Sequence, residues 1–183
     1  SEYSGLYEIS DRELYDFHRE RWLILGDGEA DLMACETIPS IRETEVLLRL
    51  IAESPGMWAW ISFSCSDGKH LCDGHLLREA ARLCEAEPRV AAVGINCTGP
   101  ELISPLIREA RRGTGKPILA YPNSGEAYDA KDKRWGSTPS PISLDEAAEG
   151  WVREGASGVG GCCRVGPDHI AAMRAALDAP LED

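Results

Sequence analysis

Two neighbouring cysteines, Cys162 and Cys163, follow two glycines in the segment GVGGCCRVG near the end of the chain. Adjacent residues of a regular strand point to opposite faces, so two thiols that act together require the strand to end there. Gly160 and Gly161 are expected to let the chain bend as it leaves the strand, because glycine adopts backbone conformations that other residues avoid. We therefore expect both sulfur atoms to face the same end of a sheet.

A third cysteine, Cys97, closes the segment VAAVGINC, which has the composition of a buried strand. Three thiolates that converge from two strand ends suit Zn²⁺, which is tetrahedral and takes soft sulfur ligands. Three protein ligands, instead of the four of a structural site, leave one position open for a substrate. The spacing alone leaves two alternatives open, a vicinal disulfide between Cys162 and Cys163 or two packed thiols.

The other cysteines and the histidines do not share this pattern. Four cysteines fall inside predicted elements or in a loop and are expected to be small buried hydrophobes or unused thiols: Cys35, Cys65, Cys72 and Cys84. Four histidines show no ligand spacing and are expected to be solvated or packed: His18, His70, His75 and His169.

Helical and strand patterns alternate along the whole chain. Helices are predicted over residues 11–25, from Ser40 to beyond Ile51, and over 73–86, 100–112, 143–154 and 167–177. Strands, short and apolar on both faces, are predicted over residues 30–37, 57–64, 90–96, 117–121 and 157–161. Ser40 with Glu43 and Ser143 with Glu146 have capping-box spacing, and a long polar loop is expected over residues 125–141.

Alternating units of this kind predict an α/β fold with parallel strands and right-handed crossovers. Two architectures fit, an open doubly wound sheet and a (β/α) barrel, and five strands on their own favour the open sheet. The length predicts a single domain over residues 1–183. In either architecture active sites form at the carboxyl ends of the strands. The residues expected at those ends are Glu36, Cys97, Tyr121, Asn123, Cys162 and Cys163.

The net charge is −12, from 31 acidic and 19 basic side chains, which disfavours nucleic acid as a partner. No run of 18 apolar residues predicts a membrane span, and the polar N-terminus lacks the features of a signal peptide. The chain has seven cysteines, an odd number, and no export signal, so metal binding is favoured over a disulfide scaffold. The same observations favour a cytoplasmic location. A first residue other than Met, followed by a helix, favours a chain that begins partway through a longer one.

Four segments together resemble the homocysteine S-methyltransferase family, in particular its branch that uses S-methylmethionine. They are ACET (34–37), GINC (94–97), YPNSGEAYD (121–129) and GGCCR (160–164), and the resemblance runs from about Tyr15 to Leu177. The family is a (β/α)₈ barrel whose catalytic zinc is held by three cysteines. The resemblance implies that Cys97, Cys162 and Cys163 are the ligands. It also implies that the chain holds strands four to eight of the barrel and lacks the first three.

The resemblance further implies transfer of a methyl group from S-methylmethionine, or from S-adenosylmethionine, to homocysteine, which gives methionine. Glu36 would bind the homocysteine ammonium group; otherwise it is a helix-start acid or an ion-pair partner. Asn123 would bind a polar end of either substrate, or act as a turn residue. Tyr121 would offer a ring face to the sulfonium, or pack ordinarily. A second acid that the family carries on its first strand has no counterpart in this chain.

Three alternatives compete with this hypothesis. The methyl donor could instead be betaine or a methyl-corrinoid partner. The chain could be a truncated, non-catalytic fragment that binds zinc. A redox role for a Cys162–Cys163 disulfide is the third alternative. The expected partners are therefore small molecules, with no nucleic acid and no membrane, and the sequence does not indicate an oligomeric state.

Overall fold

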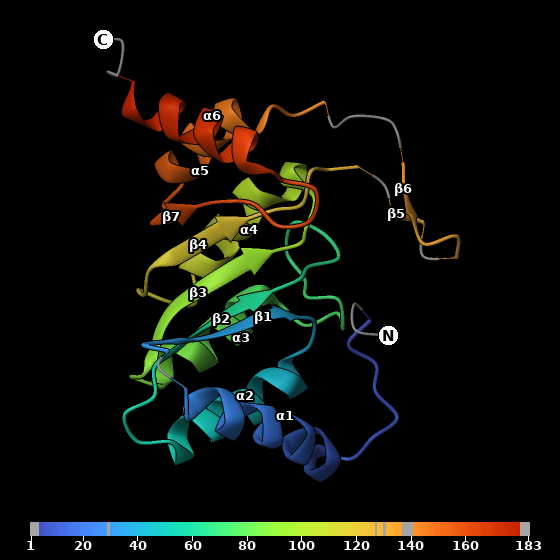
Figure 1. Ribbon diagram of the computed structural model, residues 1–183, viewed down its shortest axis with the longest axis vertical. Coiled ribbons are helices and arrows are strands. Elements are labelled where there is room, and N and C mark those ends of the chain that lie inside the picture. Colours follow the sequence, from blue (N-terminus) through green and yellow to red (C-terminus); the bar gives the residue numbers. More distant parts are fainter. Residues whose placement is uncertain (1–3, 29, 127, 130, 137–140, 180–183) are drawn as a thin grey trace.

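A computed structural model of the chain describes residues 4–28, 30–126, 128–129, 131–136 and 141–179. Five strands form one parallel sheet in the order β1-β2-β3-β4-β7 (Figure 1). They are β1 (Met33–Ile38), β2 (Ala59–Phe63), β3 (Val90–Asn96), β4 (Ile118–Tyr121) and β7 (Gly158–Val159). The expected strands are therefore confirmed, with β7 shorter than predicted.

Six helices alternate with these strands. They are α1 (Asp11–Gly26), α2 (Ile41–Glu53), α3 (Leu77–Ala86), α4 (Pro100–Arg111), α5 (Leu144–Arg153) and α6 (Pro167–Asp178). Each helix packs on the next one along the chain, and α3 and α4 lie behind the sheet in Figure 1. The strand order never reverses, so the sheet lacks the switch point of a doubly wound fold. The architecture is therefore that of a segment of a (β/α) barrel. The count of five strands, which on its own favours an open sheet, does not identify this architecture.

The core lies between the sheet and the helices. Ala59, Ile61 and Phe63 of β2 are fully buried, whereas Trp60 between them is half-buried. The opposite face of the sheet carries Ser62 and other polar side chains, so the expectation of strands that are apolar on both faces is wrong for β2. The alternation has period two because successive strand residues point to opposite faces.

The start of α3 differs most from the sequence prediction. The helix begins at Leu77, not near Asp73, and the preceding residues form a loop. The Asp73 carboxylate accepts hydrogen bonds from the Ile41 and His75 backbone N–H groups, which ties the loop to the start of α2. Asp73 is therefore held in a tertiary contact that the local helical pattern does not reveal.

The predicted capping boxes form only in part. Ser40 Oγ accepts from the Glu43 N–H at 3.2 Å, but the Glu43 carboxylate contacts Tyr7 and His18 instead of returning to the cap. Ser143 makes no capping hydrogen bond. A complete capping box instead starts α1, between Ser10 and Glu13.

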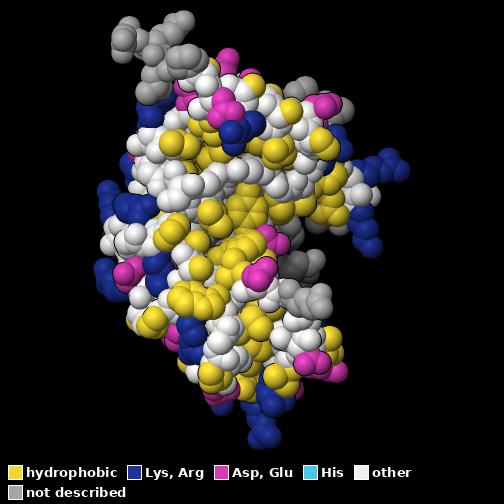
Figure 2. All heavy atoms as spheres, turned by 60° about the vertical axis from the view of Figure 1, so that its left-hand side comes forward, with side chains coloured by type: hydrophobic (Ala, Val, Ile, Leu, Met, Phe, Trp, Pro, Cys, Tyr) yellow, Lys and Arg dark blue, Asp and Glu magenta, His cyan; other side chains and the backbone are white. Residues whose placement is uncertain are grey.

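The long polar loop contains a short antiparallel pair, β5 (Tyr128–Asp129) and β6 (Arg134–Trp135), which projects to the side in Figure 1. Apolar side chains gather in a broad band across the face shown in Figure 2, with charged side chains mainly at its margins. None of the described helices has the length and apolar character needed to cross a membrane.

Candidate metal centre

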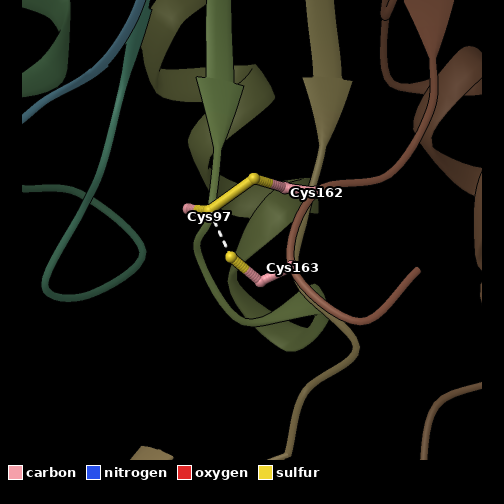
Figure 3. A group of neighbouring side chains, drawn as sticks. All are labelled: Cys97, Cys162 and Cys163. Atoms are coloured by element: carbon pink, nitrogen blue, oxygen red, sulfur yellow. Dashed lines mark hydrogen bonds between the residues drawn. A yellow bond between two sulfur atoms is a disulfide. The ribbon is translucent and has the colours of Figure 1, made fainter. Parts of the chain in front are cut away.

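Cys97 leaves β3 in a tight turn. The strand ends at Asn96, and Cys97 adopts a left-handed backbone conformation with φ of 47°. Its N–H still bonds to the Tyr121 carbonyl at 3.4 Å, so the turn begins while the chain is attached to β4. This geometry turns the Cys97 side chain toward the carboxyl end of the sheet (Figure 3).

The two neighbouring cysteines leave β7 along the end of β4. The Cys162 N–H bonds to the Pro122 carbonyl at 2.7 Å, and the Val165 N–H closes a turn onto the Cys162 carbonyl at 3.2 Å. The left-handed residue of this turn is Arg164, with φ of 63°. The Cys162 and Cys163 thiols both lie at the carboxyl end of the sheet, because the chain has left the strand and begun to turn at these residues.

The glycines before the thiols act differently from the expectation. Neither Gly160 nor Gly161 has the left-handed φ that only glycine adopts readily. A Cβ atom on Gly161 would lie 2.1 Å from Val165 Cγ1, so close packing of the turn requires glycine there. Space, and not backbone conformation, explains this residue.

Three sulfur atoms meet at this end of the sheet. The Sγ atoms of Cys97, Cys162 and Cys163 lie within 4.8 Å of one another, and Cys97 Sγ is 3.4 Å from Cys163 Sγ. A disulfide joins Cys97 and Cys162 (Figure 3), so the vicinal Cys162–Cys163 disulfide considered above is not the one that forms. In the reduced state three soft donors at one point fit a zinc ion, with a fourth position left for another ligand.

The remaining cysteines have different surroundings. Burial raises the pKa of Cys84 to about 12, and that of Cys35 to about 12 with a further contribution from Glu36. Burial also raises the pKa of Cys65 well above its ordinary value. Thiols that resist ionisation are poor metal ligands, which agrees with their assignment as packed residues.

The histidines also have other partners. His18 contacts Glu43 at 2.7 Å, His70 contacts Asp67 at 2.9 Å and His75 contacts Asp73 at 3.0 Å. His169 Nδ1 accepts a hydrogen bond from the Gly166 N–H at 3.1 Å. Within the described residues the only candidate metal group is the cysteine cluster.

Glu36 and Tyr121 line one hollow on the open face of the sheet. It has a volume of about 320 Å³, and its walls also include Trp60, Leu119 and Gly158–Gly161. Glu36 does not end its strand as expected, since β1 continues to Ile38 with an irregularity after Cys35. Burial raises the pKa of Tyr121 to about 12, and the nearby Glu36 adds to this increase. Tyr121 therefore remains a neutral hydrogen-bond donor at neutral pH.

Asn123 occupies a turn between the two cysteine loops. Its N–H bonds to the Thr98 carbonyl at 3.2 Å, and its Oδ1 accepts from the Gly125 N–H at 2.9 Å. The next residue, Ser124, donates its N–H to the Cys163 carbonyl at 3.0 Å. Asn123 thus has the side-chain contact of a turn residue, the alternative given for it above.

The sequence does not reveal the network of polar side chains that supports the thiols. Asn96, Ser62 and Thr37 form hydrogen bonds across β1, β2 and β3, next to Cys162. The sequence indicates part of this network, because residues two apart in a strand share a face, and so Trp60 and Ser62 lie on the same face of β2. Arg164 forms an ion pair with Glu126 that lowers the pKa of this carboxyl and holds the turn after Cys163.

Comparison with known proteins identifies similar chains of greater length. The family described as homocysteine S-methyltransferase matches residues 1–177. Homocysteine S-methyltransferase YbgG of Bacillus subtilis (strain 168) is 44% identical, over 96% of this chain and 56% of the relative. The selenocysteine Se-methyltransferase of Brassica oleracea var. italica is 41% identical, over 97% of this chain and 53% of the relative.

Solved structures of one related enzyme have a similar fold over nearly all of this chain. The metallated form of the homocysteine methyltransferase MmuM from Escherichia coli superposes with a TM-score of 0.81 at 36% identity, over 96% of this chain and 55% of that one. Its oxidized form superposes with a TM-score of 0.80 at 38% identity, over the same shares. The chain therefore spans about half the length of the relatives it matches. It has an α/β fold that corresponds to the C-terminal part of their barrel.

Proposed function

Because the chain belongs to the homocysteine S-methyltransferase family, we propose that it supplies the metal centre of an enzyme that methylates homocysteine to give methionine. The observation that carries this proposal is the convergence of Cys97, Cys162 and Cys163, whose Sγ atoms lie within 4.8 Å of one another.

The three cysteines are proposed to hold Zn²⁺ in their reduced form. Zinc, when bound, favours the thiolate form of a coordinated thiol and so supplies a sulfur nucleophile at neutral pH. The role of the chain is to bring the three donors together and leave the fourth position accessible. The turns at Cys97 and Arg164 do this, because they direct thiols from two strand ends toward one point.

The disulfide between Cys97 and Cys162 uses two of the three proposed ligands. A sulfur atom in a disulfide carries no thiolate charge, so the oxidised cluster lacks the donor set that zinc requires. Metal binding and methyl transfer are therefore proposed to need the reduced protein. Oxidation of the cluster is therefore proposed to join Cys97 to Cys162, and not Cys162 to Cys163.

Glu36 and the aromatic residues of the hollow are proposed to receive the substrates. The Glu36 carboxylate would pair with the homocysteine ammonium group, and the Trp60 and Tyr121 rings beside it would face a sulfonium. Asn123 would contribute its amide Nδ2 to a polar end of a substrate, since its Oδ1 is held by Gly125. Each role is electrostatic or steric, and none requires the side chain to change its protonation state.

S-methylmethionine is the proposed donor, with S-adenosylmethionine as an alternative. Both carry a sulfonium whose leaving group is a neutral thioether, and the net charge of −12 favours a cationic ligand. The YPNSGEAYD segment favours this class over betaine or a methyl-corrinoid partner. The transfer forms a bond from the methyl carbon to the homocysteine sulfur and breaks the bond to the donor sulfur.

The test compares initial rates with four donors at equal concentrations. The full-length protein is reduced, loaded with zinc and given homocysteine with S-methylmethionine, S-adenosylmethionine, betaine or a methyl-corrinoid protein. We expect the highest rate with S-methylmethionine. A higher rate with betaine or the corrinoid would overturn the donor assignment. Binding of zinc without methylation by any donor would support the non-catalytic alternative.

A further inference from the structure

We propose that Asn96 is a positioning residue that donates a hydrogen bond to Cys162 Sγ and so distinguishes this thiolate from the other two. The inference deepens the proposed zinc site and rests on it. Asn96 is the last residue of β3, immediately before Cys97, and its side chain is 1% exposed. Asn96 Nδ2 donates a hydrogen bond to Cys162 Sγ at 3.8 Å in the structure, where this sulfur is joined to Cys97. We expect the same contact to the Cys162 thiolate in the reduced protein.

The surroundings of Asn96 fix the orientation of its amide. Asn96 Oδ1 lies 3.0 Å from the Thr37 backbone nitrogen, which can only donate, so the oxygen must be on that side. Ser62 Oγ donates to the same oxygen at 2.8 Å. The two amide protons therefore face the remaining partners, Thr37 Oγ1 at 2.7 Å and Cys162 Sγ.

A second fixed donor sets the direction at the other end of the network. The Trp60 indole N–H can only donate, and it bonds to the Tyr121 hydroxyl at 3.1 Å. The Tyr121 hydroxyl then donates to Ser62 Oγ at 2.6 Å, which leaves the Ser62 proton for Asn96. Every donor thus points toward Asn96, and the chain of hydrogen bonds ends at the sulfur.

This network holds Asn96 rigidly. Turning the amide over would set Nδ2 against the Thr37 N–H and leave a buried donor without an acceptor, which is unfavourable. Among the described residues, Cys97 and Cys163 have no comparable side-chain N–H donor. Asn96 therefore acts on one ligand of the three.

The hydrogen bond has two expected effects on a bound metal. It fixes the rotamer of Cys162, and it withdraws electron density from that sulfur, which makes Cys162 the weakest electron donor of the three thiolates. Partners beyond the ligands of a metal typically change its affinity by about 10–100-fold when they are removed. The sheet thereby tunes the metal through β1, β2 and β4 without a further ligand.

A direct test uses the wild-type protein at full length, reduced and loaded with ¹¹³Cd²⁺. A side-chain amide proton hydrogen-bonded to a metal-bound sulfur shows scalar coupling to the cadmium nucleus. We expect this coupling for one Nδ2 proton of Asn96 and for no other side-chain amide. Its absence in a protein that binds cadmium would overturn the inference, whereas failure to bind cadmium would overturn the proposed metal centre itself.

Asn96→Asp provides the second measurement. The variant keeps an oxygen for Thr37 and Ser62 but replaces the donor with an oxygen that faces Cys162. We expect a decrease of about 10–100-fold in metal affinity by chelator competition. In the cobalt-loaded protein we expect the thiolate-to-metal charge-transfer band to shift, because the electron density on Cys162 changes.

Thr114→Val is the matched control, because Thr114 is also a buried polar residue, with its hydroxyl on Glu85 and remote from the thiols. It should lower stability without changing the metal affinity or the band. An Asn96→Asp variant that changes stability alone, as the control does, would show a merely structural role and overturn the inference. If Asn96→Asp does not fold, the cadmium coupling decides.

Discussion

Left-handed backbone concentrates around the thiols at the level of single residues. Three of the four described non-glycine residues with positive φ lie there, namely Thr37, Cys97 and Arg164, with φ of 63°, 47° and 63°. Such conformations cost on the order of 1 kcal/mol or more each and persist where the surrounding structure enforces them. Cys97 is itself a proposed ligand, and Arg164 lies in the turn that follows the other two ligands. Thr37 contacts Asn96, which in turn contacts Cys162.

Cys163→Ser tests the ligand assignment at this scale. A serine hydroxyl is a far weaker zinc donor than a thiolate, so we expect metal content to fall from about one zinc per chain to below about a tenth. Methyl transfer should fall in parallel. Elemental analysis and initial rates on the reduced protein provide the measurement. Cys72→Ser is the matched control, because Cys72 Sγ only donates to Ser64, as a hydroxyl also can. Equal zinc loss in both variants would contradict the assignment.

The Tyr121 hydroxyl predicts a dependence of stability on high pH. Its pKa is raised by burial from the ordinary 10.0 to about 12 in the folded state. The stability that this shift contributes is complete below about pH 10 and declines as the pH rises toward 12. The difference in free energy of unfolding between the wild type and Tyr121→Phe should therefore shrink over this range. Urea denaturation at several pH values measures it, and a constant difference would be inconsistent with the raised pKa.

At the level of elements, two glycines test how tightly the strands approach. A Cβ on Gly94 of β3 would lie 2.4 Å from the Ser62 Cβ, whereas one on Gly150 of α5 would meet nothing within 4 Å. We expect Gly94→Ala to destabilise the protein by about 1–3 kcal/mol through overpacking. Gly150→Ala should instead stabilise it by about 0.5–1 kcal/mol, because alanine favours the helix.

Urea denaturation of both variants measures these changes. Gly94→Ala should also weaken metal binding, because the displaced Ser62 is a partner of Asn96. Two variants of equal stability would show that β2 and β3 do not approach as closely as described.

The sequence predicted the order of the elements well, because short apolar runs and helical periodicity are local signals. It failed at the start of α3, where Asp73 contacts the start of α2, and at the hairpin of β5 and β6. The convergence of the three thiols at one edge of the sheet could be predicted, because each of the cysteines follows a strand. The support from Thr37, Ser62 and Asn96 could not, since it depends on the irregularity in β1 and on the register between strands.

At the level of the whole molecule, the sheet formed by the described residues has two edge strands, β1 and β7, each with a neighbour on one side only. Unpaired edges of this kind promote association between chains. We expect the 183-residue chain alone to self-associate with rising concentration in sedimentation velocity experiments. Ala34→Lys places a charge on an exposed position of the β1 edge and should reduce this association. A monomer at every concentration would contradict this expectation.

The most direct test of the central claim is the zinc content of the full-length protein in two redox states. Elemental analysis of the reduced, gel-filtered protein should give about one zinc per chain, and the same protein after oxidation should give almost none. Thiol titration should show the loss of two thiols as the Cys97–Cys162 disulfide forms. Zinc retained in full by the oxidised protein, or absent from the reduced one, would contradict a centre built from Cys97, Cys162 and Cys163.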